Sequence, residues 1–190
     1  MDKNKVKFGL SEVHIFPITS DDATGTKYET GFPLKGAVSL SLSPEGDSEP
    51  FYADNKAYYV STSNNGYSGS LEMALLNDDF YTKILGMKQD TTSGLMVESM
   101  EDMPTEFAMA FQFEGDANAT RHILYRCKAS RPKVEGETIA DKTSPKTDSF
   151  DFTSLARISD GKIKAKVEAG SKSYETFFDK PAEISTVTSA

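Results

Sequence analysis

Apolar and polar residues alternate with a period of two over much of this chain. Apolar residues hold every second position in residues 6–10 and, after a slip near Ser11, in residues 13–17. The alternation is clearest in residues 38–43, where each apolar residue is followed by a serine. Successive side chains of a strand point to opposite faces of its sheet, so this period predicts β-strands with one buried face.

Further short apolar or aromatic segments are separated by Gly, Asp, Asn and Pro. A turn at Asp54-Asn55 joins two of them into a hairpin. About nine or ten strands at such short spacing predict a mainly β fold, either a β-sandwich or a barrel. The additional strands are expected at residues 51–52, 58–60, 71–75, 107–113, 121–129, 150–155 and 162–167.

One short α-helix is predicted over residues 78–85, flanking the β-structure. Asn77 can cap its N-terminus, where two aspartates complement the helix dipole. Phe80 and Ile84 lie four residues apart and therefore share one face of the helix. Gly86 supplies the stop signal.

Three stretches lack any periodicity and are expected to be loops, namely residues 19–36, 43–50 and 130–148. Loops of this length are uncommon in a compact domain and usually have a function or are disordered. The chain is expected to form one domain over residues 1–180. Residues 181–190 are small and polar, and are expected to form a flexible C-terminal tail.

The charge is unevenly distributed. The chain carries 21 basic and 29 acidic side chains, a formal net charge of −8. Residues 31–116 hold four lysines against fourteen carboxylates, whereas residues 121–190 hold thirteen basic and ten acidic groups. Such an acidic chain is not typical of a nucleic-acid binder. The two halves are either ordinary solvated faces or surfaces through which copies of the protein meet.

Motifs that carry catalysis or bind metals and cofactors are not found in the sequence. It has no phosphate-binding loop, paired-histidine zinc helix, EF-hand loop or Cys-x-x-Cys. His122 and Cys127 lie five residues apart in a predicted strand, so they are expected to point to opposite faces. We therefore expect no catalytic residue, no cofactor and no metal, and expect that the protein is not an enzyme.

The single cysteine leaves no possibility of an intrachain disulfide. The N-terminal residues lack the apolar region of a signal peptide, and no apolar segment has the length of a membrane span. The chain is therefore expected to be soluble, made in a cytoplasm and without a membrane partner.

Several segments resemble, in their order and amino-acid sequence, those of the major tail proteins of siphophages of Gram-positive hosts. The similarity extends over roughly residues 5–180. The two most specific segments are the hairpin around Tyr52-Ala53-Asp54-Asn55 and the entry to the helix. The segments are Phe51-Tyr52-Ala53-Asp54-Asn55-Lys56, Gly66-Tyr67-Ser68-Gly69-Ser70-Leu71-Glu72, the helix ending Ile84-Leu85-Gly86, residues 107–113, residues 121–127, and Pro145-Lys146-Thr147-Asp148-Ser149-Phe150-Asp151-Phe152.

The resemblance implies a tail-tube β-sandwich or barrel whose six-subunit rings stack into a tube. It further implies a virion protein that encloses the tape measure protein, meets tail terminator and distal tail proteins, and lets DNA pass without specific binding. Synthesis in the cytoplasm of the bacterial host is implied as well. One alternative is the inner-tube protein of a contractile tail or tailocin. Others are a carbohydrate-binding β-sandwich and a secreted β-sandwich hydrolase.

Two groups of residues are the candidate functional positions of such a subunit. The mixed charges of the third loop suggest an arm that packs on a neighbouring subunit, although a disordered surface loop would look similar. Carboxylates of the acidic half suggest a lumen that repels DNA, although on the exterior they would simply aid solubility. The inter-subunit candidates are Arg131, Lys133, Glu135, Glu137, Asp141, Lys142 and Lys146, and the lumen candidates are Glu45, Asp47, Glu49 and Asp54.

Overall fold

The alternating segments pair into one large antiparallel sheet. The computed structural model describes residues 4–138 and 145–184. Nine strands form the main sheet in the order β2-β1-β10-β11-β12-β7-β4, with β13 beside β11 and β3 beside β1. The strands are β1 (Leu10–Asp22), β2 (Gly25–Tyr28), β3 (Phe32–Leu34), β4 (Ala37–Glu45), β5 (Ser48–Ala53), β6 (Lys56–Thr62), β7 (Gly66–Met73), β8 (Lys88–Gln89), β9 (Met96–Val97), β10 (Phe107–Phe113), β11 (Thr120–Ala129), β12 (Asp148–Ser154) and β13 (Lys164–Glu168).

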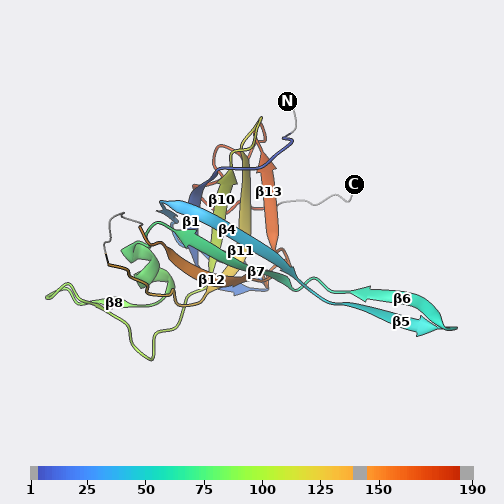
Figure 1. Ribbon diagram of the computed structural model, residues 1–190, viewed down its shortest axis with the longest axis horizontal. Helices are drawn as coiled ribbons and strands as arrows, with labels where there is room; N and C mark the ends of the chain where they lie inside the picture. Colours follow the sequence, from blue (N-terminus) through green and yellow to red (C-terminus); the bar gives the residue numbers. More distant parts are fainter. Residues whose placement is uncertain (1–3, 139–144, 185–190) are drawn as a thin grey trace.

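The sheet bends strongly, so that β12, β7 and β4 cross over β1, β10 and β11 (Figure 1). The larger apolar cluster lies inside this bend and holds alternate residues of β10, Phe107 and Met109 among them. The smaller cluster lies on the opposite face of β10 and β11, where Phe177 of the C-terminal segment packs beside Tyr125. The mainly β, sandwich-type fold expected from the sequence is confirmed.

The predicted helix exists, but most of it is a π-helix instead of an α-helix. Asn77 Oδ1 accepts a hydrogen bond from the backbone N–H of Phe80 at 3.0 Å, as a cap should. Backbone N–H of Leu85 bonds to the carbonyl of Phe80, five residues back, which defines η1 (Phe80–Ile84). Phe80 and Ile84 are both fully buried, and the Phe80 ring lies 4.5 Å from that of Phe150. The helix therefore closes the larger cluster.

Residues 19–36 are not a long loop, and that prediction is wrong. β1 continues to Asp22 and forms a hairpin with β2, after which β3 pairs with β1. The end of β1 is polar because it lies at the margin of the sheet, where neither face is fully buried. Backbone pairing without apolar alternation leaves no period-two signal in the sequence.

The first strand also begins later than its pattern predicts. Residues 5–9 form no strand, and Val6 and Phe8 are more than half exposed. The slip near Ser11 is confirmed, since Glu12 has a φ of +52° and the pairing of β1 with β10 shifts there. This is a β-bulge, which inserts one unpaired residue into a strand.

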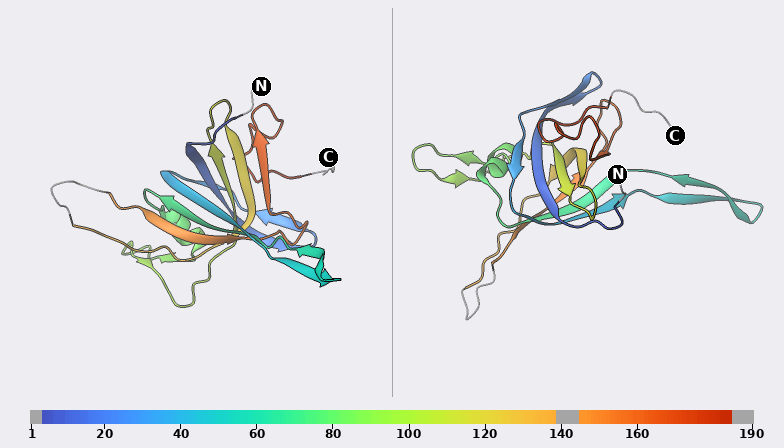
Figure 2. Two further views of the ribbon diagram at one scale, coloured as in Figure 1. Left: turned by 45° about the vertical axis from the view of Figure 1, so that its right-hand side comes forward. Right: turned by 90° about the horizontal axis from the view of Figure 1, so that it is seen from above.

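The prediction of a loop over residues 43–50 is also wrong for the most part, because β4 continues to Glu45 and β5 begins at Ser48. The third predicted loop, residues 130–148, is confirmed in its described parts, which contain no helix or strand before β12. That loop projects from the body, as Figure 2 shows. Of the predicted C-terminal tail, residues 181–184 pack on the smaller cluster, where the Tyr125 hydroxyl donates to the carbonyl of Ala182.

Candidate assembly surfaces

The hairpin of β5 and β6, called the arm from here on (residues 48–62), extends far beyond the body (Figures 1 and 2). It continues the pair formed by β4 and β7, whose last partners are Glu45 and Gly66. Between the two ladders, the N–H of Ser63 donates to the carbonyl of Asp47 at 2.9 Å. A Cβ atom on Gly46 would lie 2.1 Å from the carbonyl oxygen of Ser63, so the root of the arm needs glycine there.

The tip of the arm is a tight turn at Asp54 and Asn55, as the sequence predicts. Both residues have positive φ values, +52° and +60°. Two successive residues of this kind form the turn whose twist matches that of paired strands, and Asn and Asp tolerate it better than other residues. The arm is therefore a well-specified hairpin rather than an irregular loop.

Almost every side chain of the arm is exposed. The four aromatic rings of Phe51, Tyr52, Tyr58 and Tyr59 expose 62%, 66%, 75% and 64% of their surface. An isolated two-stranded hairpin is only marginally stable in water, and a cluster of exposed apolar side chains usually marks a binding surface. The arm thus has the composition of an element that another molecule covers.

Apolar side chains occupy both faces of the arm. Phe51 lies opposite Tyr59, and the adjacent Pro50 lies opposite Val60. Neighbouring residues of a strand point to opposite faces, so each of these two pairs marks a different face. A single flat surface could cover only one of them.

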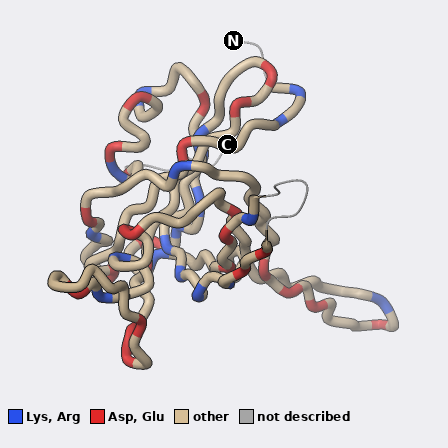
Figure 3. The backbone as a smooth tube through the Cα atoms, turned by 60° about the vertical axis from the view of Figure 1, so that its left-hand side comes forward, with Lys and Arg blue, Asp and Glu red and all other residues tan. Residues whose placement is uncertain are grey.

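The four candidate lumen acids all lie on the arm or at its root. Glu45 ends β4 and accepts a hydrogen bond from the Ser68 hydroxyl at 2.5 Å, whereas Asp47 lies in the connection to β5. Glu49 lies within β5, and Asp54 lies at the tip. Figure 3 shows acidic residues along the arm, with one basic residue near its tip. That these acids face a lumen stays a prediction.

The candidate inter-subunit loop is a second projection. Lys146 and Glu137 form an ion pair of 2.9 Å that joins its two limbs. Arg131 at its base pairs with Glu98 at 2.8 Å. Lys133 and Glu135 are exposed, while Asp141 and Lys142 lie outside the described residues. The role of this loop between subunits stays a prediction. No such role was predicted from the sequence for the aromatic residues of the arm, although the adjacent Tyr58 and Tyr59 break the period of a half-buried strand.

A groove lies between this loop and the segment that contains β8 and β9. Its cavity measures about 580 Å³. Met100 and Val134 line it from two different segments and are 100% and 97% exposed. The ion pair of Arg131 with Glu98 connects the two walls. The groove is lined by Tyr81, Leu85, Met87, Glu98, Ser99, Met100, Asp102, Pro104, Ser130, Arg131, Pro132 and Val134.

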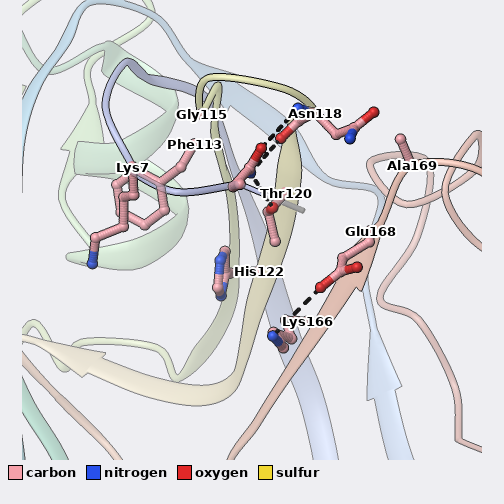
Figure 4. Close-up of a pocket in the computed structure, with 10 residues that line it drawn as sticks. Lys7, Phe113, Gly115, Asn118, Thr120, His122, Lys166, Glu168 and Ala169 are labelled. Carbon is pink, nitrogen blue, oxygen red and sulfur yellow. Dashed lines mark hydrogen bonds and ion pairs between the residues drawn. The ribbon is translucent and has the colours of Figure 1, made fainter. Parts of the chain in front are cut away.

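A second cavity, of about 490 Å³, surrounds His122 (Figure 4). The imidazole stacks on the ring of Phe111 with 5.4 Å between centroids. Burial, together with Lys164, Lys166 and Lys7, lowers the pKa of His122 to about 4. The charged neighbours that act on this ring are cations, whereas a catalytic histidine is usually oriented by a carboxylate that raises its pKa.

The prediction that His122 and Cys127 point to opposite faces is wrong. Phe107 pairs with Cys127 and Met109 with Leu124, so β11 contains one more residue than β10 between these pairs. This bulge brings Cys127 onto the face of Leu124, in the larger cluster. Cys127 is 1% exposed, and burial raises the pKa of its thiol to about 12. A buried thiol of this kind is a packing residue, not a nucleophile.

Within residues 4–138 and 145–184, no three His, Cys, Asp or Glu side chains come together in a way that could hold a metal ion. In the same part of the chain, no helix has the length and apolar character that crossing a bilayer requires.

Among solved structures, the chain is similar to one chain of the "Cryo-EM structure of the anti-feeding prophage (AFP) baseplate, 6-fold symmetrised". The two share 10% sequence identity with a TM-score of 0.46, over 88% of this chain and 97% of that one. No family model matches the chain, and neither does any of the curated proteins compared with it.

Proposed function

We propose that this protein is a structural subunit of a phage-type tail tube. In this proposal, copies associate head to tail into rings, and the rings stack into a tube. The sequence resemblance supplies the class of particle, and the arm supplies the physical means of association. The protein is then a component of a virion or of a related particle, made in the host cytoplasm, with no catalytic role.

The arm is the single observation that carries this proposal. It presents four exposed aromatic rings on a well-specified hairpin that no other described part of the chain covers. A monomeric binding module would place such rings on a rigid face, whereas here they lie on a ribbon that reaches out from the body (Figure 1). A ribbon that becomes buried on assembly is a means of joining subunits.

The proposal includes partners beyond the protein itself. The tube would enclose the tape measure protein and end at tail terminator and distal tail proteins. DNA would pass through the lumen without specific binding, and the acids Glu45, Asp47, Glu49 and Asp54 would contribute to its repulsion. The loop of residues 130–148 would form a second contact between subunits.

The test is assembly of the purified full chain, followed by sedimentation and negative-stain microscopy. The wild type should form rings or tubes. A variant with Phe51→Ser, Tyr58→Ser and Tyr59→Ser should remain a folded monomer, because it keeps the hairpin but removes the apolar groups that association buries. A matched control, Ser61→Ala with Thr62→Ala on the same strand, should assemble normally. A wild type that stays monomeric at every concentration overturns the proposal.

Two forms of this function remain within the proposal. The sequence resemblance favours the tube of a siphophage, and the other form is the inner tube of a contractile tail or tailocin. Micrographs of particles from producing cells separate them, since only the contractile form has a sheath around the tube.

A further inference from the structure

We propose that the groove between residues 87–104 and residues 130–134 receives the arm of a second copy of this chain. This inference rests on the proposed function, because it names the surface through which the subunits join. The occupant is therefore the arm of a neighbouring copy, and the contact is heterologous.

The placement of the two surfaces supports a head-to-tail contact. The arm and the segment with β8 and β9 project from opposite ends of the longest axis of the molecule (Figure 1). Within one chain the arm therefore does not lie at the groove. When two different surfaces at opposite ends of a subunit bind each other, each added copy exposes the same pair of surfaces again, and the result is a ring or a filament.

The arm has two apolar faces, and the groove has two walls. The arm has apolar pairs on both faces, Phe51 with Tyr59 and Pro50 with Val60. The groove has two walls from segments far apart in the sequence, with Met100 on one and Val134 on the other. A ribbon that is apolar on both faces needs such a two-walled site if both faces are to leave water.

The chemistry of the two surfaces is complementary as well. Methionine side chains adapt to irregular contacts and interact favourably with aromatic rings, and both Met87 and Met100 line the groove. At the tip of the arm, Lys56 would meet an acidic rim that includes Asp102. In return, Asp54 would approach Arg131. These rim charges would fix the register of the arm more than its affinity.

The area available is adequate for a stable contact. An aromatic side chain buries about 150–250 Å², and the four rings of the arm are on average two-thirds exposed. Covering them would remove roughly 400–650 Å² of surface from water on the side of the arm. A typical specific interface buries about 800 Å² on each partner, and Pro50, Val60 and the backbone of the arm would supply the difference.

The first experiment is cross-linking between two variants of the full chain that each carry one added cysteine. Tyr58→Cys and Met100→Cys are purified separately, mixed in equal amounts, allowed to assemble and treated with a short bis-maleimide. We expect a cross-linked dimer that contains one copy of each variant. The natural Cys127 is 1% exposed, so the wild-type background does not react. As a control, Tyr58→Cys is mixed with Val6→Cys, whose position is exposed but lies outside the groove. This mixture should give no cross-linked dimer.

The second experiment uses complementation. The arm variant described above keeps an intact groove, and a groove variant with Met100→Glu and Val134→Glu keeps an intact arm. All these positions are exposed, so both variants should fold. Each alone should remain monomeric, whereas their equimolar mixture should form heterodimers, because one arm and one matching groove remain between them.

The outcomes separate this inference from the proposed function. Heterodimers and the Tyr58–Met100 cross-link support the inference. If the wild type assembles and the groove variant assembles normally as well, the inference is overturned and the proposed function stays intact. The same conclusion follows if the wild type assembles but no Tyr58–Met100 cross-link forms. A wild type that never assembles overturns both.

Discussion

The β10 strand and the arm are both built by antiparallel strand pairing, but β10 is buried in the monomer and the arm is exposed. Both form antiparallel ladders with their neighbours, each with one register shift. Residues 107–112 of β10 are all buried, whereas every residue of β6 is exposed. β10 is paired on both edges and lies between two apolar clusters of its own chain, whereas β5 and β6 pair only with each other and have no such cover. Hydrogen bonding forms a strand, but the strand contributes to the stability of the monomer only where its side chains are buried.

The largest effect is expected at Phe80, on the body side of this comparison. The ring is fully buried against Phe107 and Phe150 in the larger cluster. Phe80→Ala should lower the free energy of unfolding by about 3–5 kcal/mol, because it removes apolar surface and leaves a cavity. Urea unfolding followed by far-ultraviolet circular dichroism measures this value.

The matched change on the arm is Tyr58→Ala. This side chain is 75% exposed, so the free energy of unfolding of the monomer should change by no more than about 0.5 kcal/mol. If instead Tyr58→Ala destabilises the monomer as much as Phe80→Ala, the arm is covered within its own chain and the comparison fails.

An effect smaller than that at Phe80 is expected at the cap of the helix. Asn77→Ala removes the acceptor of the Phe80 N–H and should lower the free energy of unfolding by about 1 kcal/mol. Asn77→Asp keeps an acceptor at the same place and should restore most of the stability. Equal losses in both variants would mean that the contact of the Asn77 amide with the Pro33 carbonyl, and not the cap, accounts for the effect.

The last of the expected changes in body stability concerns His122 and depends on pH. The pKa of His122 in the folded protein is lowered from 6.5 to about 4, chiefly by burial. Between these values the unfolded chain binds a proton that the folded protein excludes, so stability falls as the pH falls through this window. His122→Gln should make this fall shallower, by less than about 1 kcal/mol because the ring borders an open cavity. Parallel pH profiles of the two proteins would contradict the lowered pKa.

Short sequence signals were sufficient to predict the elements whose conformation depends on a few adjacent residues. Asn77 and Gly86 bracket the helix, and Asp54-Asn55 form the turn of the arm, because capping and positive φ are properties of a few adjacent residues. The π-helical hydrogen bonding of residues 80–84 was not predicted, because capping and stop signals do not distinguish it from an α-helix.

Two features set by pairing between distant segments left no trace in the sequence. The bulge that moves Cys127 to the face of Leu124 changes no residue type, so the simple period gave the wrong face. The polar end of β1 is a strand because β2 supplies its partners, not because of its own pattern. The aromatic residues of the arm have the composition of a core, and no signal in the sequence indicated that they would be exposed in the monomer.

The central claim is that the arm becomes buried only on assembly, and hydrogen–deuterium exchange measures this directly. The exchange of residues 48–62 is compared between protein below its assembly concentration and assembled rings or tubes. We predict rapid exchange in the monomer and strong protection in the assembly, with β10 protected in both states. Assembled particles in which the arm exchanges as fast as in the monomer would contradict the claim.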